Sequence, residues 1–320
     1  MAALKSAHAR YAAHAARGCG YAFRSLDGED GYLFEVRDGA RCAVFAAGAG
    51  SPYALNDARA ASIARDKAFC AEVLRQAGVS VLAGEMFFVT KRWADMRRPG
   101  REVEDALAYS RRAAYPIFCK PISASNGLYA EVVEDASAFA DYVARVSKEH
   151  FAILTQPYVQ ADEYRVFVLE GRALFSYRKS APGVAGDGVS TLRGLIEAMP
   201  RDPHEPVRKL HGRDAQGHRV ALDDVPAQGQ HIVLEGPANR AAGGGAYALS
   251  DGAPAAMADV AIAATNAIGL KLAAVDMFDL KGAFTVIEVN SNPMIATLED
   301  HGRWDLIAEI WRANFAAALK

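Results

Sequence analysis

Cysteine is scarce and scattered in this chain of 320 residues. Its four cysteines, Cys19, Cys42, Cys70 and Cys119, lie far apart and form no C-x-x-C pair. This spacing favours neither a disulfide framework nor a zinc site. It is typical of reduced thiols, so we expect a cytoplasmic protein.

Long apolar runs and a charge excess of one sign are also missing. No stretch approaches the length of a membrane span, and the N-terminus has no apolar signal core. Residues 1–17 are rich in Ala and Arg and lack acids, which weakly resembles a transit peptide, although a short amphipathic helix is the preferred interpretation. The net charge of −2, from 36 basic and 38 acidic residues, gives no overall attraction for nucleic acid or membrane. We therefore expect small-molecule substrates.

The order of the predicted elements indicates an α+β chain with antiparallel hairpins. A hydrophobic content of 51% is enough for a large core, and we expect one compact unit built from two or three lobes. We predict an N-terminal lobe over residues 1–56, a central region with the first lobe of the main fold over 57–155, and a second lobe over 156–320. Residues 200–230 are rich in Pro, Gly, Asp, Arg and His and are predicted to form a lid or a functional loop.

Periodicity and turn residues predict the individual elements. A hairpin is expected over 31–45, and a helix capped at Asp57 is expected to run to Ala77, with Gly78 just beyond its end. The remaining predicted strands are 82–89, 116–120, 128–133, 151–154, 163–169, 173–177, 273–278 and 286–290. The remaining predicted helices are 102–112, 136–148, 190–198, 256–268 and 304–319.

The most informative motif is the strand that contains Glu288 and Asn290. Side chains alternate along a strand, so these two polar groups share a face. A turn at residues 279–282 would bring Asp276 of the preceding strand opposite Glu288. Oxygen ligands at a hairpin suit Mg²⁺ that also holds substrate phosphates. The alternative is an ordinary solvated strand face with Asp276 paired to a lysine.

Three other segments carry polar groups where strands end. Lys120 ends an apolar strand before the small residues 123–127, which suits a phosphate clamp or a plain turn with a solvated lysine. The sequence has neither a Walker A loop nor a G-x-G-x-x-G loop after a strand. The extended segment from Gln156 to Glu163, stiffened by Pro157, suits a hinge that reads a purine edge, or a simple linker.

Two clusters of cations remain. Arg178 and Lys179 end a strand, where they could stabilise phosphoryl charge or form a solvated edge. Arg240 precedes Gly243 and Gly244 in a loop that could hold an oxyanion, or could be a flexible surface loop.

These motifs, in this order from Asp57 to Asp300, resemble the ATP-grasp superfamily of carboxylate-amine ligases. The resemblance is strongest to the ATP-grasp domains of cyanophycin synthetase and of bifunctional bacterial glutathione synthetase. It rests on the runs Val184–Thr191, Asn239–Gly244 and Glu288–Pro293. It implies an ATP-grasp fold in which two α/β lobes sandwich ATP, preceded here by a short N-terminal lobe.

The resemblance also implies roles for individual residues. It implies ATP contacts from Lys67, Lys120, Gln156, Pro157, Tyr158, Val159, Glu163 and Lys179. It implies a catalytic set of Arg240, Lys179, Gly243 and Gly244, and a metal set of Asp276, Glu288 and Asn290 for two Mg²⁺, which Mn²⁺ could replace. The chain departs from the family pattern at Ala241 and Ala242, where a serine and a threonine are usual, and residues 1–55 match no substrate domain.

The function implied is an ATP-dependent ligase that joins a small carboxylic acid to an amine through an acyl phosphate. Two alternatives stay open at this point, an ATP-grasp phosphotransferase and an ATP-binding regulatory module without turnover. The sequence leaves homo-oligomerisation open.

Overall fold

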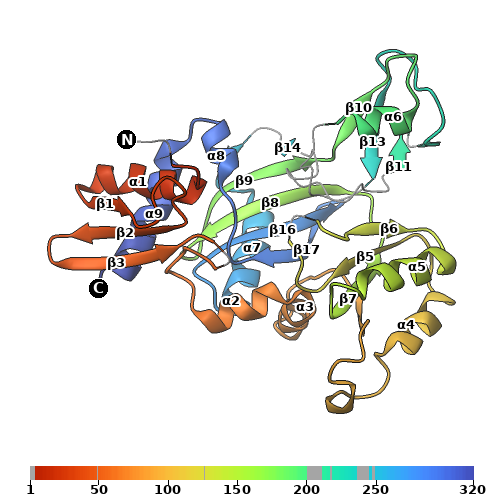
Figure 1. The fold of residues 1–320 in the computed structure, drawn as a ribbon, viewed down its shortest axis with the longest axis horizontal. Helices are drawn as coiled ribbons and strands as arrows, with labels where there is room; N and C mark the ends of the chain where they lie inside the picture. The colour runs from red at the N-terminus through yellow and green to blue at the C-terminus, as the bar shows by residue number, and fades with distance from the viewer. Residues whose placement is uncertain are drawn as a thin grey trace. The chain divides into compact units, whose positions relative to one another are not determined.

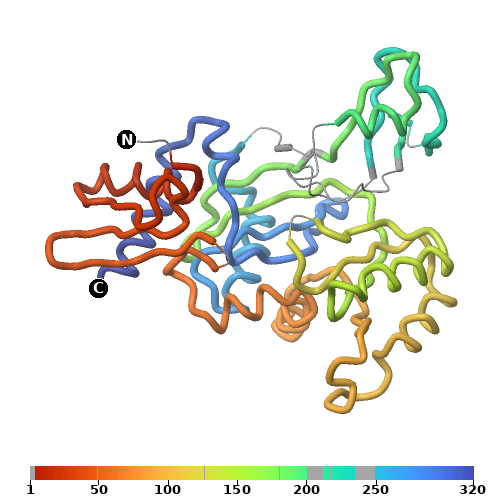
Figure 2. The backbone as a smooth tube through the Cα atoms, in the orientation of Figure 1, coloured from red at the N-terminus to blue at the C-terminus, as the bar shows by residue number. Residues whose placement is uncertain are grey.

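The structure is a computed structural model that describes residues 4–48, 50–125, 127–199, 211–216, 218–235, 245–246 and 249–320. Figure 2 draws the backbone, with the other residues in grey. The chain divides into two compact units. The first comprises residues 1–81, 164–177 and 249–320, and the second comprises residues 82–163 and 178–248. The lobe boundaries predicted from the sequence stay a prediction.

The N-terminal part of the first unit is a small sheet covered by helices. Strands β1 (Ala22–Ser25), β2 (Leu33–Asp38) and β3 (Arg41–Ala46) pair in that order and are antiparallel, which confirms the predicted hairpin. Helix α1 (Ala7–Cys19) packs against α9 (Trp304–Ala318) (Figure 1). The fully buried Trp311 of α9 lies against Phe34 and Phe45 of the sheet. Apolar side chains from both ends of the sequence therefore share one core.

A long antiparallel hairpin forms the centre of the first unit. Strands β16 (Leu272–Leu280) and β17 (Ala283–Asn290) are joined by the predicted turn, in which Gly282 has a φ of 90° and its N–H donates to Asp279 Oδ1. The sheet continues from β16 to β8 (Asp162–Leu169) and β9 (Arg172–Ser180), with the short strands β14 (Gly245–Ala246) and β15 (Ser250–Asp251) paired to β9. Helix α7 (Ala255–Ile268) covers β16 and β17.

The prediction of a single helix over residues 57–77 is wrong. The structure has two helices, α2 (Ala58–Arg65) and α3 (Lys67–Gln76). Asp66 between them is extended, with φ −87° and ψ 105°, and its carboxylate accepts the N–H groups of Ala68 and Phe69. Asp66 therefore caps a new helix, as Asp57 caps the first. Lys67 becomes the first residue of α3.

One asparagine fixes the start of α2 to the hairpin. Asn56 donates from Nδ2 to the carbonyls of Leu272 and Ser291, and its Oδ1 accepts the N–H groups of Lys271 and Leu272. The amide thus joins the beginning of β16 to the residue after β17. The short helix α8 (Ala296–Asp300) follows, and Tyr11 Oη donates to its Glu299 at 2.7 Å.

The second unit contains a four-stranded sheet of order β4-β7-β5-β6. Its strands are β4 (Glu85–Phe88), β7 (Ala152–Pro157), β5 (Ile117–Pro121) and β6 (Glu131–Val133). Helices α4 (Val103–Ser110) and α5 (Ala136–Val146) pack on it and form a core with Phe87, Phe139 and Ile153. The predicted strands and helices of this region are confirmed, although most are shorter than predicted, β5 is shifted by one residue and β7 extends to Pro157.

A second sheet of this unit includes two short strands within residues 200–230, the segment predicted to form a lid or a functional loop. Strands β10 (Gly183–Ala185), β13 (His231–Glu235), β11 (His211–Arg213) and β12 (Arg219–Val220) pair in that order, beside helix α6 (Leu192–Glu197). Part of the segment is therefore a hairpin packed on the core of Val184, Leu192 and Ile232. Residues 200–210 lie outside the described residues, and the role of a lid stays a prediction.

Candidate functional site

The hairpin of the first unit brings the predicted metal residues together. Asp276 of β16 pairs directly with Glu288 of β17, as the sequence predicted. Asn290 Nδ2 donates to Glu288 Oε1 at 3.2 Å, so these two side chains share a face. The register shifts after Asp276, because Met277 pairs with Val286 and leaves Ile287 as an extra residue. The bulge therefore lies directly beside the pair of carboxylates.

Two cations compensate the facing carboxylates. Like charges opposite one another on neighbouring strands repel, and Asp276 is only 1% exposed. Arg165 of β8 donates from Nε and Nη2 to both oxygens of Asp276, at 2.6 and 2.7 Å. Lys67 Nζ lies 3.8 Å from Glu288 Oε2. The alternative of a solvated strand face is wrong, since Asp276 is buried and both of its oxygens accept hydrogen bonds from Arg165.

Arg165 stays charged in this position. Burial by itself lowers the pKa of its guanidinium, but the charge and hydrogen bonds of Asp276 outweigh burial, and the pKa is well above its usual value. The sequence reasoning missed Arg165. The sequence contains only a partial signal, since Arg165 lies on the same predicted strand as Glu163, but the order of the strands in the sheet decides that this strand lies beside Asp276.

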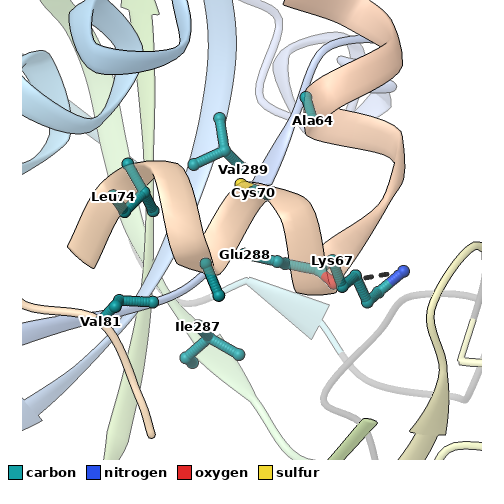
Figure 3. Close-up of a pocket in the computed structure, with 9 residues that line it drawn as sticks. Ala64, Lys67, Cys70, Leu74, Val81, Ile287, Glu288 and Val289 are labelled. Atoms are coloured by element: carbon teal, nitrogen blue, oxygen red, sulfur yellow. Dashed lines mark ion pairs between the residues drawn. The ribbon is translucent and has the colours of Figure 1, made fainter. Parts of the chain in front are cut away.

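Lys67 and Glu288 lie beside each other in the lining of a small pocket between α3 and β17 (Figure 3). Cys70, Leu74, Val81 and Val289 form most of its apolar wall. Burial raises the pKa of the Cys70 thiol to about 12, so this thiol is protonated at neutral pH. Lys67 and Glu288 are thus the charged side chains of an otherwise apolar pocket.

The donor set suits Mg²⁺. Two carboxylates and an amide supply hard oxygen ligands, and Mg²⁺ is usually held by one or two carboxylates together with substrate phosphates. Among the described residues, no group of three or more His, Cys, Asp or Glu side chains could hold a metal by itself. A metal here would therefore depend on further oxygens from a bound substrate.

The second unit contains a buried amide without a full set of partners. Gln156 is 2% exposed, and its Nε2 donates to the carbonyl of Leu82 at 3.3 Å. Its Oε1 is buried and accepts no hydrogen bond. Leaving such an acceptor unsatisfied costs about 1–3 kcal/mol. Pro157 ends β7 directly after it, and Tyr158 and Val159 follow outside regular structure.

Two lysines of the second unit are buried. Lys120 lies at the end of β5 and is 5% exposed, so the interpretation as a solvated lysine is wrong. Lys179 of β9 is 8% exposed and forms an ion pair with Glu163 of β8. Its neighbour Arg178 is more exposed and pairs with Asp162 at 3.0 Å. The sheet therefore turns Lys179 inward and leaves Arg178 at the solvated edge.

The remaining predicted residues lie outside the described part of the chain. They are Arg240, Gly243 and Gly244.

The fold is that of a known family. The structure is similar to D-alanine–D-alanine ligase from Bacillus anthracis, with a TM-score of 0.51 and 13% identity over 82% of this chain and 71% of that one. The family model of the RimK-like ATP-grasp domain matches residues 238–313, which include the β16–β17 hairpin. The chain has the ATP-grasp fold. The predicted resemblance and fold class are confirmed.

Curated relatives of this ATP-grasp chain are bifunctional glutathione biosynthesis proteins. The protein GshAB of Desulfotalea psychrophila is 24% identical over 72% of this chain and 31% of its own length. That of Mannheimia succiniciproducens is 28% identical over 68% of this chain and 33% of its own length. The chain thus spans about a third of the length of these relatives. No helix in the described ranges is long and apolar enough to cross a membrane.

Proposed function

We propose that this ATP-grasp chain is an ATP-dependent carboxylate-amine ligase that forms an amide bond through an acyl phosphate. The observation that carries the proposal is the buried Asp276, paired in register with Glu288 and compensated by Arg165. Two opposed carboxylates with dedicated cations are costly to maintain. An ATP-grasp fold gives them a use, since they would hold the Mg²⁺ of the nucleotide.

The residues divide into three sets. Asp276, Glu288 and Asn290 would hold two Mg²⁺, which Mn²⁺ could replace. The nucleotide set is Lys67, Lys120, Gln156, Pro157, Tyr158, Val159, Glu163 and Lys179. In this set the unsatisfied Oε1 of Gln156 would accept the amino group of adenine, Glu163 would bind the ribose, and the lysines would neutralise phosphates. The third set, Arg240, Gly243 and Gly244 with Lys179, would stabilise the oxyanion.

The chemistry follows from the substrates. An oxygen of the carboxylate attacks the γ-phosphorus of ATP and the bond to ADP breaks, which gives an acyl phosphate. The nitrogen of the amine then attacks the acyl carbon, loses a proton, and phosphate leaves. The metal would neutralise charge on the transferred phosphoryl group. Lys120 and Lys179 would add positive charge, because both are already buried and therefore interact strongly with an anion.

The substrates would be a small carboxylic acid, such as an amino acid, and an amine. The relatives are named for glutathione biosynthesis, which supports substrates of this class. We place the protein in the cytoplasm, because none of its four cysteines is in a disulfide. The proposal is independent of whether the chain forms a homo-oligomer.

Conversion of ATP to ADP over pooled carboxylic acids, with and without pooled amines, tests the proposal. Phosphate release that requires both an acid and an amine supports a ligase. Formation of a stable phosphorylated acid without amine would instead indicate a phosphotransferase, and no turnover with any pool would indicate a binding module.

Glu288→Gln tests the site itself. It keeps the shape of the side chain and removes its charge, so turnover should fall by at least about a hundredfold while the circular dichroism spectrum stays unchanged. Glu85→Gln, at an exposed glutamate of the second unit, is the matched control and should keep full turnover. Full activity in Glu288→Gln would show that Glu288 is not a metal ligand required for turnover.

A further inference from the structure

A surface loop of the second unit, residues 90–102, has no role in the proposed ligase. It joins β4 to α4 and contains a single 3₁₀ turn at Ala94–Met96. Five of its residues are basic, Lys91, Arg92, Arg97, Arg98 and Arg101, and two are acidic, Asp95 and Glu102. The side chains of Trp93 and Met96 at its tip are 52% and 79% exposed. We call residues 90–102 the Trp93 loop.

Contacts of Arg97 and Phe88 fix the base of the Trp93 loop. Arg97 stacks on Phe88, with its guanidinium carbon 4.1 Å from the ring centre. It also donates to the carbonyl of Thr90 at 2.9 Å and pairs with Glu102 at 3.1 Å. The N–H of Phe88 donates to the carbonyl of Arg101 at 2.7 Å. A loop fixed in this way presents its tip with little further loss of entropy on binding.

The exposed tryptophan is held in an unfavourable backbone conformation. Trp93 has φ 59° and ψ 30°, a left-handed conformation that is rare for bulky residues. This conformation lays its ring 5.7 Å from Phe151 and under the guanidinium of Arg92, at 4.0 Å. Apart from these two contacts, the unfavourable backbone conformation holds the ring at the surface, which points to a use there.

The cations at the surface are available to a partner. Lys91, Arg92, Arg98 and Arg101 are exposed, and in the described part of the chain no carboxylate lies in ion-pair distance of any of them. Glu102 is already paired with Arg97, so Asp95 is the loop acid that faces solvent beside them. Trp, Met and Arg are the residues enriched in protein interfaces. The surface thus combines an apolar tip with surrounding positive charge.

We propose that the Trp93 loop binds an acidic peptide segment in which carboxylates flank an apolar side chain. The apolar side chain would pack on Trp93 and Met96, and the carboxylates would reach Lys91, Arg92 and Arg98. A peptide suits this surface better than a nucleic acid, because a phosphate at every nucleotide would also meet Asp95. A membrane suits it less, because Arg92 covers one of the two faces of the Trp93 ring and would be drawn into the lipid with it.

Fluorescence anisotropy with a short labelled peptide tests the proposal. The probe has glutamates on both sides of a central leucine, and the reference peptides replace either the glutamates by glutamine or the leucine by serine. Trp93→Gly removes the ring in a conformation that glycine adopts freely, and Arg98→Glu reverses one charge. Arg111→Glu and Arg112→Glu, at exposed arginines of the same unit, are the matched controls.

We expect the glutamate–leucine probe to bind, and Trp93→Gly and Arg98→Glu each to weaken it about tenfold. The two control variants should bind the probe like the unaltered chain. Equal binding of the glutamine peptide, equal weakening by the controls, or no binding of the probe overturns the proposal. So does tighter binding of oligothymidylate or of phosphatidylglycerol vesicles that the loop variants abolish. Binding of the probe is measured without ATP, so it does not depend on the ligase activity.

Discussion

Replacement of Arg165 by methionine tests the electrostatics of the hairpin. Arg165 is the bidentate partner of Asp276, whose side chain is 1% exposed. Arg165→Met keeps an unbranched side chain of similar length and leaves a buried carboxylate opposite Glu288. Removing one partner of a buried ion pair costs about 3–5 kcal/mol, because the other charge stays buried after its bidentate partner is lost. We expect a loss of that size in the free energy of unfolding in urea at neutral pH.

A double variant separates the ion pair from the packing. With Arg165→Met and Asp276→Leu together, the buried carboxylate is removed along with its guanidinium partner, so the free energy of unfolding should return to within about 1–2 kcal/mol of the unaltered chain. Arg75→Met, which breaks an exposed pair with Glu72, should change it by about 0.5 kcal/mol or less. A loss below about 1 kcal/mol in Arg165→Met, or a double variant as unstable as the single one, would refute the reasoning.

Three further predictions concern other residues. Gln156→Met should leave stability nearly unchanged, since one acceptor is already unsatisfied, but should weaken ATP binding about tenfold in calorimetry; equal affinity would contradict the adenine contact. Burial lowers the pKa of His8 from 6.5 to about 4, so between these values only the unfolded chain binds the proton and stability falls as the pH falls. The loss should reach roughly 3 kcal/mol and be absent in His8→Leu, as measured by urea unfolding at each pH. Gly212→Ala should destabilise the chain by about 1–3 kcal/mol, because the new Cβ would lie 2.6 Å from a core methyl group, whereas Gly18→Ala in α1 has open space and should stabilise it slightly; the reverse order of melting temperatures would contradict both.

The register of the central hairpin could be predicted because its causes are local. The alternation around Glu288 and the turn at 279–282 together place Asp276 opposite it. Arg165 could not be assigned as the partner of Asp276 in the same way, because it lies on β8, far away in the sequence, and only the sheet order brings the two strands together. Local patterns thus predict which polar groups gather at a hairpin, but not which cation neutralises them.

The helix break at Asp66 and the short strands β11 and β12 escaped prediction for different physical reasons. The helix break at Asp66 was missed because alanine-rich helical sequence continues on both sides, so periodicity does not reveal a second cap. Strands β11 and β12 were missed because strands of three and two residues are too short to show alternation. A glycine is needed at position 212 of β11 because the side chains of Leu192 and Ile232 pack directly against its Cα. This requirement comes from residues distant in the sequence, so no local pattern reveals it.

The shared core of α1, the first sheet and α9 has a consequence for synthesis of the protein. The hydrogen bond between Arg10 and Glu299 spans 289 positions of sequence, and Trp311 follows later still. At 5–20 residues per second, Phe34 and Phe45 wait roughly 15 to 60 s for the helix that covers them. The small N-terminal sheet is therefore synthesised well before its core can be completed, and until then its apolar side chains are exposed to chaperones.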